Sequence, residues 1–484
     1  MKDSFNIKEK TVSGIRWTGV NKGVQSALAL LITVMLARLL QPEDFGLVAM
    51  ATIFTIFMGF FNEFGSGSAI IQKQGLGQRE ISSIFWFNLL VGLITTIVTV
   101  IVAPFIAMFF KEPRLGPILV VLSFTFFLSS LYNVHQAQLV KNLEFRFLYI
   151  VRISCTISSG LLAIILAYKG YGVWSLVWQA VAEELFTLIL LWVPYRWYPL
   201  IHFRWGEVRF IMNFSMNYLG FNIVNFISER LPHLLIGKFL GSESLGFYTL
   251  AQRIVAFPLE TTSYITGNVL FPVFSRIQDD NLRIGEIYLH AMKYVGFIVF
   301  PLMVGLFITA PELIQIVFGL KWTPAIFILQ VLSMAGIIQS LSINNSVLYL
   351  SKGRTDIQFI TGLLFLLIMA MSIYIGTDWG IRGVAVGYTI ASLIIIYPSL
   401  VISYGIINLK VYRLLQTLKE VFIITAVMGI PLFVFAPLLR STGIDPFLIL
   451  TSGILTGGVI YILCTLLINR KLLTSFYDMI NLRA

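Results

Sequence analysis

The stretch LARLLQPEDFGLVAM, Leu36–Met50, closes one apolar run and opens the next across the polar turn Gln41-Pro42-Glu43-Asp44. It recurs as IGKFLGSESLGFYTL at Ile236–Leu250, where Glu243 answers to Glu43 and Gly246 to Gly46, an offset of 200 residues. A second, weaker match at nearly the same offset pairs Tyr171-Gly172 with Trp379-Gly380. Each pair precedes a late helix of its half. Self-similarity at a fixed offset indicates repeated units, so we predict two homologous helical halves of about 200 residues each.

The composition indicates a polytopic membrane protein. The 484 residues are 57% hydrophobic and 12% charged, with a mean hydropathy of +0.87, whereas soluble domains carry roughly 25% charged residues. Apolar runs of about 20 residues, enough to cross a bilayer, recur along the chain. The first 12 residues are polar and show no removable signal peptide, so we expect the first helix to stay in the membrane.

The cysteine content and the distribution of charge argue against several kinds of site and binding partner. Cys155 and Cys464 both lie inside apolar runs, which argues against a disulfide framework or a thiolate metal site. We expect no cofactor and no metal. The formal charge of +11 comes from basic residues scattered singly in short loops, a pattern better explained by membrane topology than by nucleic-acid binding.

The length of the apolar runs predicts an all-α fold of about fourteen transmembrane helices. We expect them near 13–39, 45–64, 81–110, 115–139, 147–168, 172–193, 209–239, 247–272, 287–310, 323–349, 356–376, 382–404, 415–438 and 446–468. The predicted organisation is an N-terminal six-helix lobe over 1–200, a second six-helix lobe over 201–407, and two additional helices over 408–484.

The distribution of Lys and Arg predicts the orientation. About 23 of them fall on the side of the N-terminus and about 8 on the other, and such a bias marks the cytoplasmic side. Both termini should therefore be cytoplasmic. The even helix count agrees with this, because an odd number would place the termini on opposite sides. Six helices per half make the halves parallel repeats, whose interface commonly holds a transport site. No loop is long enough for a soluble catalytic domain.

Ionisable residues inside membrane segments are costly, so each is a candidate site residue. The first helix carries Arg16 and Lys22. A cationic cavity wall is one interpretation; the other is that both side chains reach the headgroups from near the helix end.

The seventh predicted helix is the most polar. Asn222, Asn225 and Glu229 share one helical face, followed by Arg230 and His233, and Pro232 should kink the helix nearby. This stretch predicts a gated cavity wall. The alternative is a buried structural pair of Glu229 with Arg230, although neighbours in sequence point apart on a helix.

Further candidates lie on three other helices. Arg253 and Glu260 are in the eighth helix, with Arg253 deep enough to be costly in lipid, and Glu63 ends the second helix. Glu183 and Glu184 in the sixth helix are weaker candidates. Asp279-Asp280 is better explained as a solvated loop than as a metal site. No Gly-rich phosphate loop is present, so transport would be driven by an ion gradient, the membrane potential or the substrate's own gradient.

Four stretches resemble the polysaccharide-transporter family of the multidrug/oligosaccharidyl-lipid/polysaccharide exporter superfamily, lipopolysaccharide and exopolysaccharide flippases, most of all the colanic-acid flippase group. They are Gln41–Met50, Gly65–Gln72, Leu235–Gly241 and Phe271–Asp280. The resemblance implies two six-helix lobes around a cationic cavity, two added C-terminal helices, and a polyprenyl-pyrophosphate-linked oligosaccharide as substrate. Cavity cations of the superfamily match Lys22 or Arg16, and Arg253. Relatives commonly carry an Asp where Pro232-His233 stand here, with Glu229 one turn away.

These features together predict a flippase of the bacterial inner membrane that moves a lipid-linked repeat unit by alternating access. It would act as a monomer among membrane lipids, with H+ or Na+ as a coupling ion and the polysaccharide biosynthesis machinery as a partner. A multidrug/cation antiporter of the same superfamily is the first alternative, although the basic residues argue against it. A membrane-embedded polymerase or ligase is the second, but it would want a large outer loop bearing catalytic groups.

Overall fold

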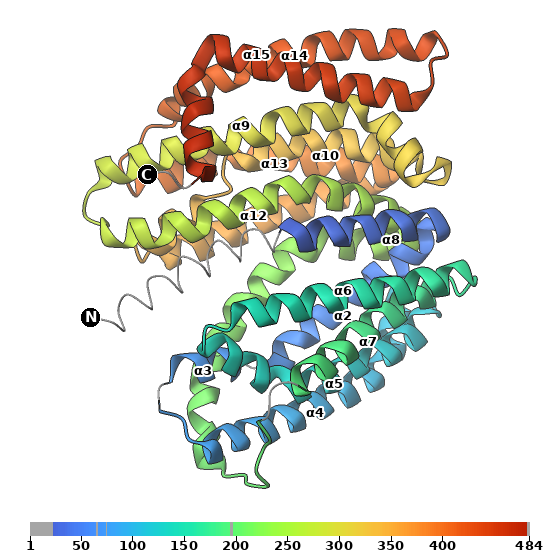
Figure 1. Cartoon of the computed structure of the whole chain (residues 1–484), viewed down its shortest axis with the longest axis vertical. Helices are drawn as coiled ribbons and strands as arrows, with labels where there is room; N and C mark the ends of the chain where they lie inside the picture. Colours follow the sequence, from blue (N-terminus) through green and yellow to red (C-terminus); the bar gives the residue numbers. More distant parts are fainter. Residues whose placement is uncertain (1–22, 64–65, 74, 194–196, 482–484) are drawn as a thin grey trace. The chain divides into compact units, whose positions relative to one another are not determined.

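A computed structural model describes residues 23–63, 66–73, 75–193 and 197–481 and contains α-helices throughout these ranges. The first described helix, Gly23–Leu39, is followed by α2 to α15 (Figure 1). Their bounds are α2 Pro42–Glu63, α3 Ser66–Gln72, α4 Gln78–Phe110, α5 Leu115–Lys141, α6 Phe145–Tyr168, α7 Val173–Trp192, α8 Trp205–Arg276, α9 Asn281–Leu313, α10 Ala325–Ser340, α11 Asn345–Ser351, α12 Thr355–Gly376, α13 Gly380–Gly405, α14 Val411–Ser441 and α15 Pro446–Asn481.

The helix count confirms the prediction of about fourteen membrane helices. Among the described residues, 10 segments are long and apolar enough to cross a membrane, and one of these, Thr355–Gly405, holds both α12 and α13. The shorter apolar helix Gly23–Leu39 and the two arms of α8, which meet at Gly241, complete the set. The protein is an all-α, multi-pass membrane protein.

The chain forms two compact units, Met1–Gly246 and Phe247–Ala484. In the first, α5 packs against both α4 and α7, and α6 packs against α7. In the second, α9 packs against α10 and α14, α12 packs against α13, and the C-terminal helices α14 and α15 run side by side (Figure 1). The lobe boundaries expected from the sequence stay a prediction.

Two matched features recur in both units, as expected of repeats. Lys141, just before α6, donates to the carbonyl oxygens of Ile70 and Lys73 at 2.8 and 2.6 Å, and so caps the end of α3. Lys352, just before α12, donates to the Gln278 carbonyl beyond the end of α8 and to Asn281. Lys and Arg side chains often satisfy the free carbonyls at such helix ends.

The glycines of the weaker repeat also match in conformation. Gly172 (φ 55°, ψ −133°) precedes α7 and Gly380 (φ 67°, ψ −158°) begins α13. Residues with a side chain are strained at positive φ, so glycine is the residue that allows this turn. The second repeat of the sequence is therefore a repeat of backbone geometry.

The polar turn of the opening stretch is the start of α2. Pro42 is its first residue, a position where the missing N–H costs nothing. The Asp44 carboxylate accepts a hydrogen bond from the Gln41 N–H at 2.9 Å, and the acidic Glu43 and Asp44 lie in the first turn, where negative charge is favourable.

The repeated glycines make a reciprocal close contact within the first unit. A Cβ on Gly46 would lie 1.7 Å from the Ser242 carbonyl oxygen, and a Cβ on Gly246 would lie 1.9 Å from the Pro42 carbonyl oxygen. Neither position has space for a side chain. The start of α2 and the start of the second arm of α8 therefore approach each other backbone to backbone, through the matching residue of each repeat copy.

Two helices differ from the sequence prediction. The break in α8 lies at Gly241 (φ 83°, ψ −178°), while Pro232 keeps helical backbone angles. The expected helix 323–349 is divided into α10 and α11. Asn344 and Asn345 lie at this division and are both buried; Asn344 accepts from Thr266 at 2.8 Å, and Asn345 accepts from Tyr288 at 2.7 Å. These side-chain bonds join the turn between α10 and α11 to α8 and α9.

Candidate functional site

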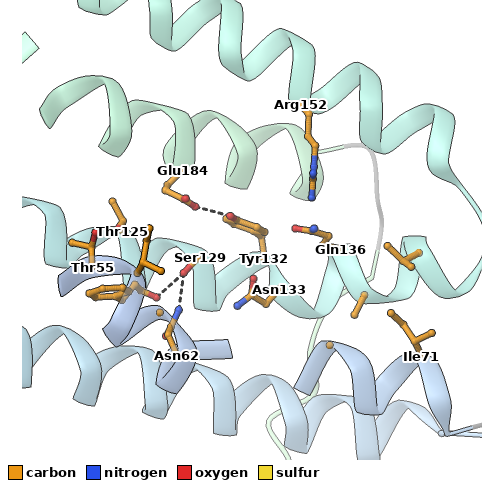
Figure 2. Close-up of a pocket in the computed structure, with 16 residues that line it drawn as sticks. Thr55, Asn62, Ile71, Thr125, Ser129, Tyr132, Asn133, Gln136, Arg152 and Glu184 are labelled. Carbon is orange, nitrogen blue, oxygen red and sulfur yellow. Dashed lines mark hydrogen bonds between the residues drawn. The ribbon is translucent and has the colours of Figure 1, made fainter. Parts of the chain in front are cut away.

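A polar pocket of about 540 Å³ lies inside the first unit (Figure 2). One face of α5 supplies half of the 16 lining residues, and polar residues recur on this face at helical spacing. Helices α2, α3, α6 and α7 supply the rest. The polar side chains of the lining include Asn62, Ser129, Tyr132, Asn133, Gln136, Arg152 and Glu184.

Two hydrogen bonds orient side chains of the pocket (Figure 2). The Asn62 amide on α2 donates to the Ser129 hydroxyl on α5 at 2.9 Å. The Tyr132 hydroxyl on α5 donates to the Glu184 carboxylate on α7 at 2.5 Å. Both bonds join different helices, so they hold the wall in one arrangement. Next to the pocket, Thr156 on α6 donates to Glu183 at 3.3 Å.

Arg152 is the cation of the pocket. It extends from α6 toward Gln136 and Tyr132 (Figure 2), and its side chain is exposed to the pocket space. Within the described part of the chain, no carboxylate lies at ion-pair distance from it. Asn133 and Gln136 add amide groups, which donate and accept hydrogen bonds. The pocket therefore offers both hydrogen-bond donors and acceptors to sugar hydroxyls. It also offers one positively charged side chain to an anion.

The structure describes only some of the site residues that were predicted from the sequence. Arg16 and Lys22 lie outside the described residues. Glu63 ends α2, and Asn222 and Asn225 lie in the first arm of α8, but their side chains are also outside what is described. Glu229 is exposed, Arg230 is half-buried and His233 is buried.

The predicted residues of the second unit lie together. Arg253 and Glu260 are both exposed in the second arm of α8, and the charge of Glu260 acts on Arg253. Two turns of helix separate them, which places them on one face. Their assignment to a transport cavity stays a prediction.

Sequence reasoning missed most of the pocket. In the sequence, Arg152 belongs to the basic residues whose distribution predicts the topology, and Tyr132, Asn133 and Gln136 are not among the predicted site residues. The signal was present in the spacing of Ser129, Tyr132, Asn133 and Gln136 along one face of α5. Glu184 had been weighed as a weak candidate, and the structure brings it to the same wall.

A cluster of polar contacts, here called the latch, joins α2, α8 and the turn between α4 and α5 in the first unit. Arg114, in the turn between α4 and α5, pairs with Glu43 of α2 and with Glu112. Ser242 of α8 donates to Glu112 at 3.4 Å, and Lys238 donates to the Phe109 carbonyl. The hydrogen-bonded Glu43 raises the pKa of Arg114. The latch thus holds α8 at Gly241 against the turn between α4 and α5.

A membrane-spanning helical unit with a polar, partly cationic pocket defines the class of a membrane transporter. Residues 35–327 match the polysaccharide biosynthesis protein family, and the chain belongs to that family. It is 29% identical over 432 residues to the teichuronic acid biosynthesis protein TuaB of Bacillus subtilis, covering 88% of this chain and 89% of the relative. It is 26% identical to the lipopolysaccharide biosynthesis protein WzxC of Escherichia coli, covering 83% and 81%.

Solved structures agree on the fold. The lipid II flippase MurJ in an inward closed conformation has a TM-score of 0.74 at 16% identity, with 94% of this chain and 99% of that chain covered. At this identity the likeness concerns the fold alone. It confirms the predicted fold of repeated helical lobes.

Proposed function

We propose that this protein is a flippase that moves a polyprenyl-pyrophosphate-linked oligosaccharide repeat unit across the bacterial inner membrane for surface polysaccharide synthesis. Family membership and the names of the relatives, which belong to teichuronic acid and lipopolysaccharide biosynthesis, support this function. The observation that carries it furthest is the pocket of the first unit, where Arg152 and several amides line a polar space within membrane-spanning helices.

The pocket chemistry suits the head group of such a lipid. Amides and hydroxyls hydrogen-bond sugar hydroxyls, and a guanidinium binds a pyrophosphate or a sugar acid through charge-assisted hydrogen bonds. The polyprenyl tail would stay in the bilayer. We assign Arg152, Gln136 and Asn133 to cargo binding in the first unit, and Arg253 to an equivalent task in the second.

Alternating access is the proposed mechanism, in line with other transporters built from repeats. The Arg114–Glu43 latch and the hinge at Gly241 would hold one side closed until cargo is bound. Glu229 and Glu184 are proposed as groups that couple transport to H+ or Na+. The protein acts as a transporter rather than an enzyme in this proposal.

The alternative is a cation antiporter, and Glu184 in the pocket is the feature that favours it. However, its carboxylate already accepts a bond from Tyr132, and the cation of the pocket wall would repel a cationic drug. The flippase is therefore the better account of the pocket.

A mass-spectrometric profile of polyprenyl-linked oligosaccharides tests the function in cells with and without this gene. We expect a completed repeat unit to accumulate on the lipid carrier, and surface polymer to be lost, when the protein is absent. An unchanged lipid pool together with increased drug sensitivity would favour the antiporter instead.

A further inference from the structure

The connector from α7 to α8 exposes a row of apolar side chains. Over residues 197–205, the exposed fractions are 60% for Tyr198, 99% for Ile201, 50% for Phe203 and 52% for Trp205. The connector is not part of any candidate membrane span. In water, such a contiguous apolar surface would be unusual and marks a contact with something else.

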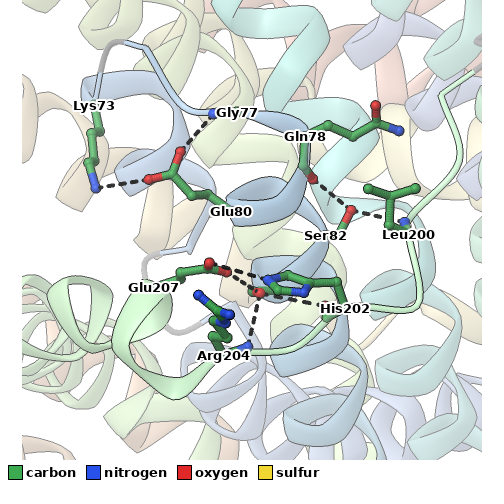
Figure 3. A network of polar contacts seen from close by, with 10 residues as sticks. Lys73, Gly77, Gln78, Glu80, Ser82, Leu200, His202, Arg204 and Glu207 are labelled. Carbon is green, nitrogen blue, oxygen red and sulfur yellow. Dashed lines mark hydrogen bonds and ion pairs between the residues drawn. The ribbon is translucent and has the colours of Figure 1, made fainter.

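The backbone of this connector is held firmly by the first turns of α4 (Figure 3). Ser82 accepts a hydrogen bond from the Leu200 N–H at 3.0 Å. The Trp86 indole donates to the Leu200 carbonyl at 2.8 Å. Ser83 accepts from the Arg204 N–H at 3.2 Å. These side chains fix the backbone, so the outward direction of the apolar side chains is a property of the fold.

The polar side chains of the connector turn toward the same helix. Ser83 donates to the Glu207 carboxylate at 2.5 Å, and His202 lies 3.3 Å from the other oxygen of Glu207 (Figure 3). Polar groups therefore satisfy one another on the side of α4, whereas the Ile201 side chain is almost fully exposed. The segment is amphipathic.

The position along α4 gives the depth of the connector in a membrane. Helix α4 has 33 residues, about 50 Å at 1.5 Å per residue, while the hydrocarbon core is about 30 Å thick. For a helix centred in the bilayer and perpendicular to it, about 10 Å extends beyond the core at each end. The contacts to the connector run from Ser82 to Trp86, within about 12 Å of the start of α4. This is the headgroup layer and its boundary with the acyl chains.

We propose that residues 197–205 form an interfacial membrane anchor, with Tyr198, Ile201, Phe203 and Trp205 among the headgroups and upper acyl chains of one leaflet. Aromatic side chains are favoured at this level of a bilayer because they combine an apolar ring with a polar edge. The exposed Arg204 and Arg209 fit the anionic lipid headgroups of such a surface. Because the connector is bonded to α4, the anchor sets the depth at which α8 begins.

Nitroxide accessibility tests this proposal in the full-length protein. Cys155 and Cys464 are replaced by Ala, and single cysteines are introduced as Ile201→Cys, Asp279→Cys and Leu455→Cys. Asp279 is the aqueous control, an exposed residue of the short loop before α9. Leu455 is the lipid control, 68% exposed within the span Pro446–Arg470. Each labelled protein is reconstituted into vesicles of phosphatidylethanolamine and phosphatidylglycerol, with no other protein present.

The ratio of collisions with oxygen to collisions with a water-soluble nickel complex reports depth. We expect this ratio at Ile201 to be severalfold higher than at Asp279 and lower than at Leu455. A ratio equal to that of Asp279 would overturn the anchor and would leave a soluble protein as the partner of this surface. Spin–spin broadening at Ile201 that disappears on dilution with unlabelled protein would overturn it in favour of a second copy of the chain.

The connector surface and the pocket that we assign to cargo binding are made by different residues. Ile201 is not among the residues that line the pocket, so the accessibility result does not depend on whether the protein is a flippase. A matched fold control is available, because each labelled variant can be compared with the cysteine-free protein in thermal unfolding, and the nearly fully exposed Ile201 has little packing to lose.

Discussion

Arg152 is a charged side chain in a membrane-spanning unit, and no described carboxylate lies at ion-pair distance from it, although its charge acts on nearby Glu183. A charge in such a position is costly unless water or a ligand compensates it. The polar neighbours Asn133 and Gln136 indicate a hydrated pocket. The anionic head group of a lipid-linked sugar is the compensation that we propose.

Replacing Arg152→Gln should lower transport strongly while leaving the fold intact. A hydrogen bond to a charged group contributes about 1.5–3 kcal/mol, so cargo binding should weaken about 10- to 100-fold. The measurement is complementation of surface polymer, or lipid-linked oligosaccharide flipping in vesicles. Arg79→Gln is the matched control, because Arg79 is exposed at the start of α4 and lies outside the pocket. Equal activity of both variants would remove Arg152 from cargo binding.

For single residues, the sequence indicated which ionisable side chains lie in membrane segments, but not which side chains they contact. Ionisable residues in apolar runs could be recognised, because charge in lipid is expensive wherever it occurs. Tyr132 and Glu184 are distant in sequence, and their hydrogen bond depends on how α5 packs against α7. No pattern within one helix can predict such a pair.

Among the elements, the contact of α2 with α8 depends on two glycines. Gly46 and Gly246 each pack against a backbone carbonyl of the other segment. Because the neighbouring atoms are backbone, they cannot move aside as a flexible side chain would. The repeat in the sequence therefore marks the point where the two copies of the motif touch.

Gly46→Ala or Gly246→Ala should each lower thermal stability. Overpacking typically costs about 1–3 kcal/mol, and the clash here is with a carbonyl oxygen. Thermal unfolding of the purified protein measures it. Gly305→Ala is the control, since nothing lies within 4 Å of its Cβ position. Three equally stable variants would contradict the close contact.

The connector at α4 should respond to acid through Glu207. The hydrogen bond from Ser83, helped by His202, lowers the pKa of Glu207. A carboxyl whose pKa is lowered in the folded state contributes stability above its unfolded pKa, and that contribution is lost as the pH falls through the folded value. We expect faster hydrogen exchange in residues 197–205 as the pH falls below about 4.5, after correction for the intrinsic rate. In Glu207→Gln this pH dependence should disappear; an identical response in the variant would exclude Glu207.

Helix positions were predictable because hydrophobic length alone decides whether a segment can span a bilayer. The division between α10 and α11 was not. Asn344 and Asn345 lie in an otherwise apolar run, and their buried side chains bond to residues of other helices, among them Thr266 and Tyr288, which the local sequence does not reveal.

For the whole molecule, the distribution of charge predicts a topology. The excess of Lys and Arg on one side predicts that both termini are cytoplasmic. A C-terminal green fluorescent protein fusion should fluoresce, and a C-terminal alkaline phosphatase fusion should be inactive. The reverse pattern would invert the predicted orientation.

The sequence by itself determined the class of protein, the number and order of its helices, the internal repeat and the family resemblance. These depend on local properties, namely the apolar length of each segment, the residues at each turn and the spacing of matched motifs. Only the tertiary structure decided that Arg152, Tyr132 and Glu184 share a pocket, that Gly46 and Gly246 meet reciprocal carbonyls, and that the connector faces its apolar residues outward. The physical reason is that a pocket, a crossing and a surface are made by segments distant in sequence, and their packing is a property of the folded unit.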